Sequence, residues 1–507
     1  AKGQTMNMGQ NPLLLTTAFP LVGVVVILLL KPKWKNAIRW IALVTSLVTF
    51  GLSLWMLSQF DAANAEMQFE VNLPWFALGS NPIGFHIGVD GISILMVLLT
   101  TFLTPLALLS TWKAVEEKVK GFMTFFLLLE TGLLGVFLSL DMVLFYVFWE
   151  FTLIPMYFLI GLWGGERRVY SAVKFFLYTM AGSVLMLAGI LWIGLQYGSF
   201  DLAQLASQGM IPVAAQLWLF GAFGLAFAIK VPMFPLHSWL PDAHTEAPTA
   251  GSVILAGVLL KMGAYGFLRF NLPLFPEATL KLAPWMAALA VIGIIYGALV
   301  AYRQKDVKKL VAYSSISHLG FVVLGIFALN QQGLQGAILQ MVNHGLSTGA
   351  LFLLVGMLYE RRHTRLLENF GGLWKVLPVM GALALVTMLS SVGLPGLNGF
   401  VGEFNILLGA FSSEAIGSPW FAGVATLGVI LAAVYLFFMF QKLFLGPVTH
   451  EENQKLKDVS VREVLILAPI LIMAFWIGLY PKPFFMLMAP AVEKLAAIVQ
   501  SAALLAH

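Results

Sequence analysis

Several acids and bases stand in the middle of long apolar runs of the sequence. Glu150 lies in FYVFWEFTLIPMYF, Lys261 lies in AGVLLKMGAYGF, and Glu130 and His344 interrupt two further apolar runs. A charge at the centre of a lipid bilayer costs at least ~2.5–3.5 kcal/mol unless it is paired or hydrated. Groups kept at that cost are suited to passing protons among themselves, so these residues predict proton transfer.

Glu150 and Lys230 are the first pair of candidates. A carboxylate between Phe and Trp is poorly solvated, so its protonation responds to a neighbouring ammonium group. Lys230 is followed at once by Val231 and Pro232, so it stands where a helix must break and water can enter. Two structural alternatives remain open: a static ion pair that fixes helix packing, and a lysine that reaches the membrane surface.

Lys261 and Glu403 extend the candidate row. Lys261 stands among small residues in mid-helix, where its ammonium group cannot easily reach the surface, so we interpret it as a central relay group. Glu403 follows SSVGLPGLNGFVG, a second stretch rich in Gly and Pro, and would be the terminal acid on the exit side. The sequence therefore predicts a relay from Glu150 to Glu403.

Three histidines and one further acid complete the set. His237, His318 and His344 could carry protons between the charged groups because imidazole titrates near neutral pH. Each could equally be a hydrogen-bonded core residue, and Glu130 could equally make a structural bond between helices. His237 and His244 are too far apart in sequence for a usual one-turn pair of metal ligands.

The composition indicates that the chain is embedded in a lipid bilayer. Of its 507 residues 60% are hydrophobic and 10% charged, and the mean hydropathy is +0.89. Soluble domains carry about 25% charged residues. The net charge of +5 is more simply explained by basic loops than by nucleic-acid binding. Without cysteine, disulfides and cysteine-ligated iron–sulfur clusters are excluded, and no nucleotide-binding or zinc-protease motif occurs. We expect no cofactor and no metal on this chain.

Apolar runs of about twenty residues predict an all-α membrane protein with about fourteen spans. We place these helices near 11–30, 40–59, 91–112, 121–139, 141–163, 171–196, 214–230, 248–268, 283–302, 310–329, 334–358, 376–411, 420–441 and 463–485. The polar start AKGQTMNMGQ lacks the basic region and cleavage site of a signal peptide, so the first run should stay.

The basic residues gather in alternate loops, as expected of loops on the cytoplasmic side. These loops lie within 31–39, 113–120, 167–174, 303–309, 361–375 and 442–462, and the opposite side holds only Lys2, Arg269, Lys281, Lys482 and Lys494. Lys230 and Lys261 are left inside the membrane. The pattern predicts a multi-pass protein of the bacterial inner membrane with both termini on the outer side.

Helices seven and twelve are both interrupted by Pro and Gly, at KVPMFPLHSWLPDAH and at SSVGLPGLNGFVGEF. The two breaks are an odd number of spans apart, which predicts two inverted five-helix repeats. We therefore expect N-terminal helices in 1–120, a first repeat in 121–270 and a second in 271–445. Residues 446–507 would then hold a cytoplasmic loop and a fourteenth helix.

Four motifs carry a resemblance over nearly the whole chain. The stretches FWEFTLIPMYFLIGLWGG, AIKVPMFPLHSWLPDAHTEAPTAGSVILAGVLLKMGAYGFLRF, AYSSISHLGF and GLPGLNGFVGEF resemble the antiporter-like subunits of respiratory complex I. HTEAPTAGSV and Glu403 are similar to the M type, called subunit four in mitochondria. The resemblance implies that Glu150 and Lys230 form the family's pair, with Lys261 central and Glu403 terminal. It also implies that His237, His318 and His344 line the hydrophilic axis.

The resemblance predicts a proton-translocating subunit of NADH:quinone oxidoreductase, with flavin, iron–sulfur clusters and quinone on other subunits. Its partners would be other membrane-arm subunits, including paralogous antiporter-like ones, and the lipid bilayer. Two alternatives stay open: a subunit of a multi-subunit sodium/proton antiporter, and a structural membrane anchor. An anchor would leave the charges within the membrane without a purpose.

Overall fold

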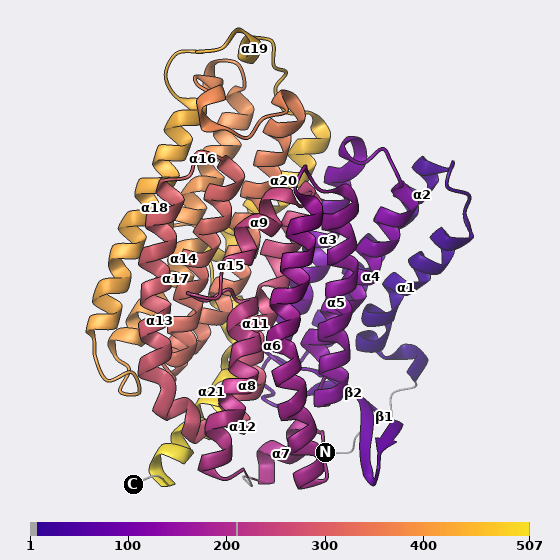
Figure 1. Ribbon diagram of the computed structural model, residues 1–507, viewed down its shortest axis with the longest axis vertical. Coiled ribbons are helices and arrows are strands. Elements are labelled where there is room, and N and C mark those ends of the chain that lie inside the picture. The colour runs from indigo at the N-terminus through magenta and orange to yellow at the C-terminus, as the bar shows by residue number, and fades with distance from the viewer. Residues whose placement is uncertain (1–7, 209–210, 506–507) are drawn as a thin grey trace.

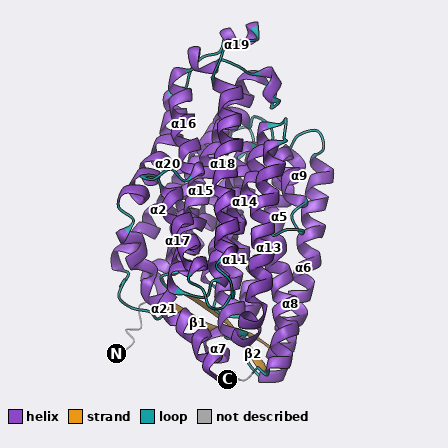
Figure 2. Ribbon diagram, turned by 90° about the vertical axis from the view of Figure 1, so that its left-hand side faces the viewer, coloured by secondary structure: helices purple, strands orange, loops and turns teal. Residues whose placement is uncertain are grey.

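The computed structural model describes residues 8–208 and 211–505 and is a bundle of long, roughly parallel helices (Figures 1 and 2). The first half of the bundle contains η1 (Met8–Gln10), α1 (Pro12–Leu29), α2 (Lys35–Gln59), β1 (Gln68–Leu78), β2 (Asn81–Val89), α3 (Ser93–Ala114), α4 (Val119–Leu138), α5 (Met142–Trp163), α6 (Arg168–Tyr197), α7 (Leu202–Gln208), α8 (Val213–Lys230), α9 (Trp239–Glu246), α10 (Thr249–Ile254), η2 (Leu255–Leu259), α11 (Lys261–Gly266), η3 (Phe267–Asn271) and α12 (Leu272–Leu274).

The second half contains α13 (Pro276–Tyr302), α14 (Val307–Phe327), α15 (Gln331–Arg362), η4 (Leu367–Asn369), η5 (Leu373–Lys375), α16 (Pro378–Val392), α17 (Asn398–Phe411), α18 (Trp420–Phe444), α19 (Glu451–Gln454), α20 (Val461–Leu479) and α21 (Lys482–Leu505). Among the described residues, 14 helices are long and apolar enough to cross a membrane. A helix satisfies its own backbone groups, which lipid cannot do. The predicted class, an all-α protein with about fourteen spans, is confirmed.

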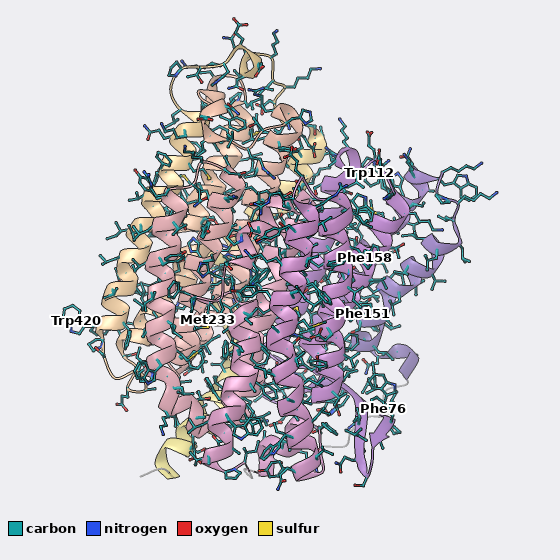
Figure 3. The ribbon with its side chains drawn as sticks, in the orientation of Figure 1. Phe76, Trp112, Phe151, Phe158, Met233 and Trp420 are labelled. Carbon is teal, nitrogen blue, oxygen red and sulfur yellow. The ribbon has the colours of Figure 1, made fainter. Side chains whose placement is uncertain are left out.

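Burial divides the spans into a core and a rim. The span Thr249–Leu274 and helix α15 are buried along the whole apolar window of each, and α14 is buried over 94% of its window. Helices α1, α2, α6, α18 and α20 bury less than half of theirs. Large apolar side chains such as Trp420, which is 77% exposed, point away from the bundle (Figure 3). A surface this apolar suits contact with lipid.

Both predicted helix breaks are present. Helix α8 ends at Lys230, and the chain turns through 231–238 before the short helix α9 begins. Helix α16 ends at Val392 with Gly393 at φ +86°, a left-handed conformation that favours glycine, and α17 begins at Asn398. The two breaks place buried polar side chains beside irregular backbone. The inverted relation between the repeats stays a prediction.

The last predicted helix, 463–485, is wrong in its extent because two helices occupy this region. Pro481 and Pro483 follow the end of α20, and proline ends one helix while it is tolerated in the first turn of the next. Helix α21 lies across one end of the bundle, where it contacts loops and the ends of other helices, including the last turn of α20 (Figure 1). Leu487 packs on Gly91, Glu493 accepts from Gln331, and Lys494 pairs with Glu66.

Among the described residues, helix α21 is one of the 14 by length and composition alone, and because it lies across one end of the bundle, the crossing formed by α16 and α17 together takes its place in the count. Helices α1 and α21 then begin and end at the same end of the bundle, which is also the end that carries the strands (Figure 1). The opposite end carries α19 and the basic loops. Lys2, assigned above to the outer side, lies outside the described residues.

An antiparallel hairpin of β1 and β2 was not predicted from the sequence. Its strands pair from Gln68 with Val89 to Leu78 with Asn81, with two register shifts. These irregularities and Pro74 hide the alternation of apolar and polar residues that marks a strand. His86 of β2 fastens the hairpin to the bundle, because Nδ1 lies 2.5 Å from Asp201. Its Nε2 lies 3.1 Å from Glu70 of β1 and links the two strands.

Candidate functional site

Lys261 begins a series of buried polar side chains that continues through His344 and His318 to Glu403. We call this series the buried polar row. The Lys261 side chain is fully buried, and the ammonium group lies 2.6 Å from Nδ1 of His344 while also donating to the carbonyl oxygen of Ala256. Wider π turns, η2 and η3, flank the short helix that begins at Lys261. Such turns shift the backbone hydrogen bonds by one residue and are frequent at functional sites. Here the shift leaves a carbonyl five residues back free to hold the ammonium group.

Glu403 and His318 continue the row. The imidazole Nδ1 of His318 lies 2.7 Å from a carboxylate oxygen of Glu403, and the amide of Gln340 donates to the same oxygen at 3.2 Å. On the other side, Nε2 of His318 lies 3.1 Å from the hydroxyl oxygen of Tyr435. The rings of His318 and His344 are 6.3 Å apart, so one water or a small side-chain movement would join the two bonded pairs.

A small polar cavity lies beside the two histidines. It has a volume of about 10 Å³ and is lined partly by His318, His344, Ser347 and Ser390. One water needs about this much space and several polar partners. The Nε2 atom of His344 is buried with no hydrogen-bond partner among the described residues, so it would be one such partner.

Asn398 was missed by the sequence analysis. Its amide donates to Ser347 and to the backbone of Asn343, and its oxygen accepts from Ser390, which ties the start of α17 to α15 and α16. Asparagine directly after a Gly- and Pro-rich break was the available signal, because such a residue can satisfy the free backbone groups of an interrupted helix. Asn398 thereby fixes the second break next to Glu403.

Glu150 and Lys230 are near each other but do not form a closed pair. Lys230 is fully buried, and its ammonium group lies 5.3 Å from the ring centre of Trp149 and 5.4 Å from that of Phe175. Within the described residues, no hydrogen bond or ion pair joins it to Glu150, and one oxygen of Glu150 is buried without a partner. The arrangement is an open one, held by rings rather than by a carboxylate.

Glu130 and His237 lie apart from the bonded row. Glu130 is 1% exposed, and neither carboxylate oxygen has a hydrogen-bond partner in the described part of the chain. The Nε2 atom of His237 lies 3.3 Å from the hydroxyl oxygen of Tyr296 on α13. The structure therefore brings four of the eight candidates into two bonded pairs, and the other four make no bond to another candidate in the described part of the chain.

Arg269 and Lys308 are two of the basic residues that were assigned to loops and are in fact buried. Arg269 belongs to the span Thr249–Leu274 and makes two bonds of 2.7 Å to the carboxylate of Asp90. Lys308 lies in the first turn of α14 and donates to the carbonyl oxygen of Ala247 at 2.5 Å. Loop assignment from charge alone fails here because a partner on another segment can hold a buried base.

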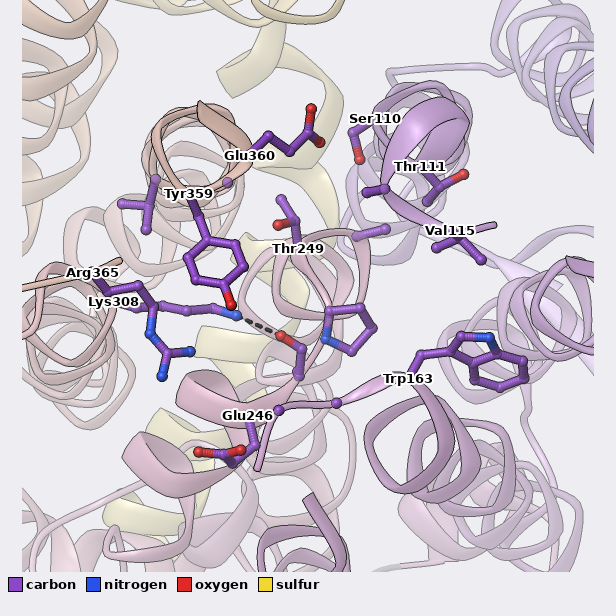
Figure 4. Close-up of a pocket in the computed structure, with 18 of the residues that line it drawn as sticks. Ser110, Thr111, Val115, Trp163, Glu246, Thr249, Lys308, Tyr359, Glu360 and Arg365 are labelled. Atoms are coloured by element: carbon purple, nitrogen blue, oxygen red, sulfur yellow. Dashed lines mark hydrogen bonds between the residues drawn. The ribbon is translucent and has the colours of Figure 1, made fainter. Parts of the chain in front are cut away.

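A larger cavity lies at the end of the bundle that carries the basic loops. It has a volume of about 480 Å³, and Lys308, Glu246, Tyr359 and Arg365 line it (Figure 4). It reaches α9, which follows the first break, and the start of α10, which leads to Lys261. Water in this cavity would stand between the basic end and the helices that carry the polar row.

The fold and the row of buried charges define a class of antiporter-like membrane subunits. The family described as NADH:quinone oxidoreductase/Mrp antiporter, transmembrane, matches residues 139–432, and the chain belongs to this family. Within it the chain is similar to NADH-quinone oxidoreductase subunit M of Rhodobacter capsulatus, with 45% identity over 96% of both proteins. It is also 44% identical to NADH-ubiquinone oxidoreductase chain 4 of Marchantia polymorpha, over 94% of this chain and 95% of that one.

A solved structure gives the same assignment. A chain of respiratory complex I from Thermus thermophilus, solved with bound NADH, superposes with a TM-score of 0.87. The two chains are 34% identical, and the match covers 96% of this chain and 99% of that one. The predicted M-type resemblance is confirmed, and the relatives are subunits of an enzyme complex.

Proposed function

We propose that this chain is a proton-translocating membrane-arm subunit of an NADH:quinone oxidoreductase. The observation that carries the proposal is the buried pair of contacts between Lys261 and His344 and between His318 and Glu403, with the two rings 6.3 Å apart. Each contact joins a group that can give a proton to one that can take it. Redox chemistry would lie on other subunits, which hold the flavin, the iron–sulfur clusters and the quinone.

The proton steps follow from the atoms that face each other. Lys261 gives a proton to Nδ1 of His344, and His344 releases the proton on Nε2 toward the small cavity and His318. His318 takes that proton on the Tyr435 side and passes the one on Nδ1 to Glu403. Each histidine stays neutral overall, so the row moves one positive charge from Lys261 to Glu403.

The open arrangement at Lys230 is the control point in this proposal. When Glu150 is ionised and close, it stabilises the protonated form of Lys230. When the two side chains move apart, Lys230 can release its proton to the next group. Redox energy reaching the subunit from its neighbours would act on this step. Protons would enter from the basic, cytoplasmic end through the cavity beside Glu246, with both termini on the outer side of a bacterial inner membrane.

The test is proton translocation by the assembled complex in sealed vesicles. Glu150→Ala and Lys230→Ala are each expected to lower proton uptake and coupled NADH oxidation at least about tenfold, because each removes one member of the switch. Glu451→Ala and Lys455→Ala, exposed residues of the α19 region, are the matched controls. Normal proton-to-electron ratios in both Glu150→Ala and Lys230→Ala would overturn the proposal.

A sodium/proton antiporter subunit is the second candidate function, because the matching family includes Mrp antiporters. Purification separates the two. Flavin and iron–sulfur polypeptides that co-purify with the chain favour the oxidoreductase, and their absence with sodium-driven proton movement favours the antiporter.

A further inference from the structure

Two adjoining cavities lie at the basic end of helices α13 and α18, which expose apolar side chains on the outside of the bundle. The first has a volume of about 370 Å³ and the second about 590 Å³, and they share Leu367, Glu368 and Lys442. Arg303 and Lys305, directly after the end of α13, line the first cavity, and Lys442 lies in the last turn of α18. We name Arg303, Lys305 and Lys442 the basic triad.

The basic triad is not neutralised by the protein. All three side chains are exposed, and none makes an ion pair within the described residues, although Glu368 lines the same cavity. Lys442 instead holds its ammonium group 5.7 Å from the ring of Phe438. Three bases against one acid leave the cavity positive, so its complement is an anion. A phosphate group offers several acceptor oxygens to such a cluster.

The walls below the basic triad are apolar and exposed. Leu299 lies one turn before Arg303 on α13 and is 52% exposed, and Val434 lies two turns before Lys442 on α18 and is 46% exposed. Tyr302 and Phe438, whose ring centres are 5.0 Å apart, stand between these walls and the bases. Aromatic residues occupy this level at membrane surfaces. The site thus has a charged upper part and an apolar lower part.

We propose that the basic triad holds the headgroup of an anionic phospholipid whose acyl chains lie along α13 and α18. A free phosphate would use only the charged part of the site and would leave the apolar walls uncovered. A lipid phosphate satisfies both parts at once, and the leaflet that attracts basic loops is the one rich in anionic lipid. The proposal concerns the outer surface of the bundle and is independent of the buried row.

The test measures lipid bound to the intact membrane assembly after mild delipidation. Phosphatidylglycerol or phosphatidylcholine is added in detergent, and bound lipid is counted by native mass spectrometry. We expect the unchanged protein to prefer phosphatidylglycerol and the triple variant R303Q/K305Q/K442Q to lose one bound molecule, with affinity about a hundredfold lower at roughly fivefold for each base. Lys442→Gln alone, which leaves the loop charges in place, should cost about fivefold.

The control removes the same charge from the same end of the bundle. Lys31, Lys33 and Lys455 are exposed and lie outside both cavities, so K31Q/K33Q/K455Q should bind phosphatidylglycerol as the unchanged protein does. Equal lipid retention in the two triple variants overturns the proposal. So does displacement of the lipid by 10 mM inorganic phosphate, or a photo-crosslink from position 437 to a neighbouring polypeptide.

Discussion

The two ends of the charged row differ in how their buried groups are satisfied. At one end Glu150 and Lys230 are near each other but unbonded, and Lys230 faces the rings of Trp149 and Phe175. At the other end His318 and Glu403 are bonded at 2.7 Å, and Gln340 and Tyr435 add further hydrogen bonds. Both ends lie in the same low-dielectric bundle.

Under the proposed function, this difference gives the two ends different roles in proton transfer. A bonded pair can transfer a proton with little movement, because donor and acceptor are already at hydrogen-bond distance. An unbonded pair must first move or admit water, so its state can depend on events elsewhere. The open end is suited to control and the bonded end to conduction, and the following changes test that division.

The largest expected effect is on stability, at a buried ion pair outside the row. Asp90→Ala leaves Arg269 buried without its carboxylate partner, which should cost about 3–5 kcal/mol. The loss would be measured as a lower midpoint of thermal unfolding and a lower yield of assembled complex. Glu66→Ala, which removes the exposed pair with Lys494, is the control and should change little. A similar loss of stability in both variants would show that the buried Asp90–Arg269 pair contributes no more to stability than the exposed pair does.

Lys261→Met should lower proton flux by about a hundredfold, because it removes the proton donor that faces His344 in the proposed transfer. The measurement is the initial rate of acidification of sealed vesicles at a fixed rate of NADH oxidation. Lys281→Met changes an exposed lysine of α13 and should keep the normal rate. Retention of more than half the flux by Lys261→Met would mean that protons bypass the bonded end.

Glu403→Gln should lower proton flux by about tenfold. The amide oxygen can still accept from Gln340, so the shape of the bonded end is kept while its terminal acid is lost. The same vesicle assay measures it, with Tyr435→Phe as the milder comparison, because that change removes only the hydroxyl group beside His318. A larger loss of proton flux in Tyr435→Phe than in Glu403→Gln would contradict the assigned direction of proton transfer.

Lys230→Met should stabilise the protein by about 1 kcal/mol, although under the proposed function it abolishes proton translocation. An unpaired ammonium group costs at least ~2.5–3.5 kcal/mol at the membrane centre, and contacts with two rings offset part of that cost. Thermal unfolding of the purified complex measures the gain, and Asp90→Ala provides the opposite sign. A lower unfolding midpoint for Lys230→Met would show that the Lys230 ammonium group stabilises the fold and is not an uncompensated buried charge.

Sequence reasoning succeeded where the signal is local. A run of twenty apolar residues is a span whatever its neighbours are, and Pro with Gly inside such a run marks a break, as at Lys230 and Glu403. An ionisable residue inside a run is equally visible, which is why Lys261 and Glu403 were found. None of these inferences required knowledge of which helices touch.

Contacts between residues far apart in the chain could not be predicted from the sequence. Arg269 reads as a loop residue until Asp90, 179 positions away, supplies its partner. The residue that bonds Lys261 lies 83 positions further on. Both the residue types and the resemblance predict a Glu150–Lys230 pair, but in the described part of the chain no hydrogen bond joins the two. The predicted helix 463–485 runs past Pro481 and Pro483 into the first residues of α21, and the rest of α21 was not predicted. Pairing depends on helix rotation and packing, which periodicity does not fix.

The smallest expected effect is a pH dependence of the stability of the hairpin, which is held by the titratable side chain of His86. Burial opposes the charged form, but the carboxylates of Asp201 and Glu70 outweigh it and raise the pKa of His86 to about 9. A pKa raised in the folded state gives stabilisation that is complete below the unfolded value of about 6.5 and is lost as pH rises through about 9. Amides of β1 and β2 should therefore exchange hydrogen faster above pH 9, by a few-fold after correction for the intrinsic rate. His86→Gln should remove the pH step, whereas a step of equal size in that variant would assign it to another group.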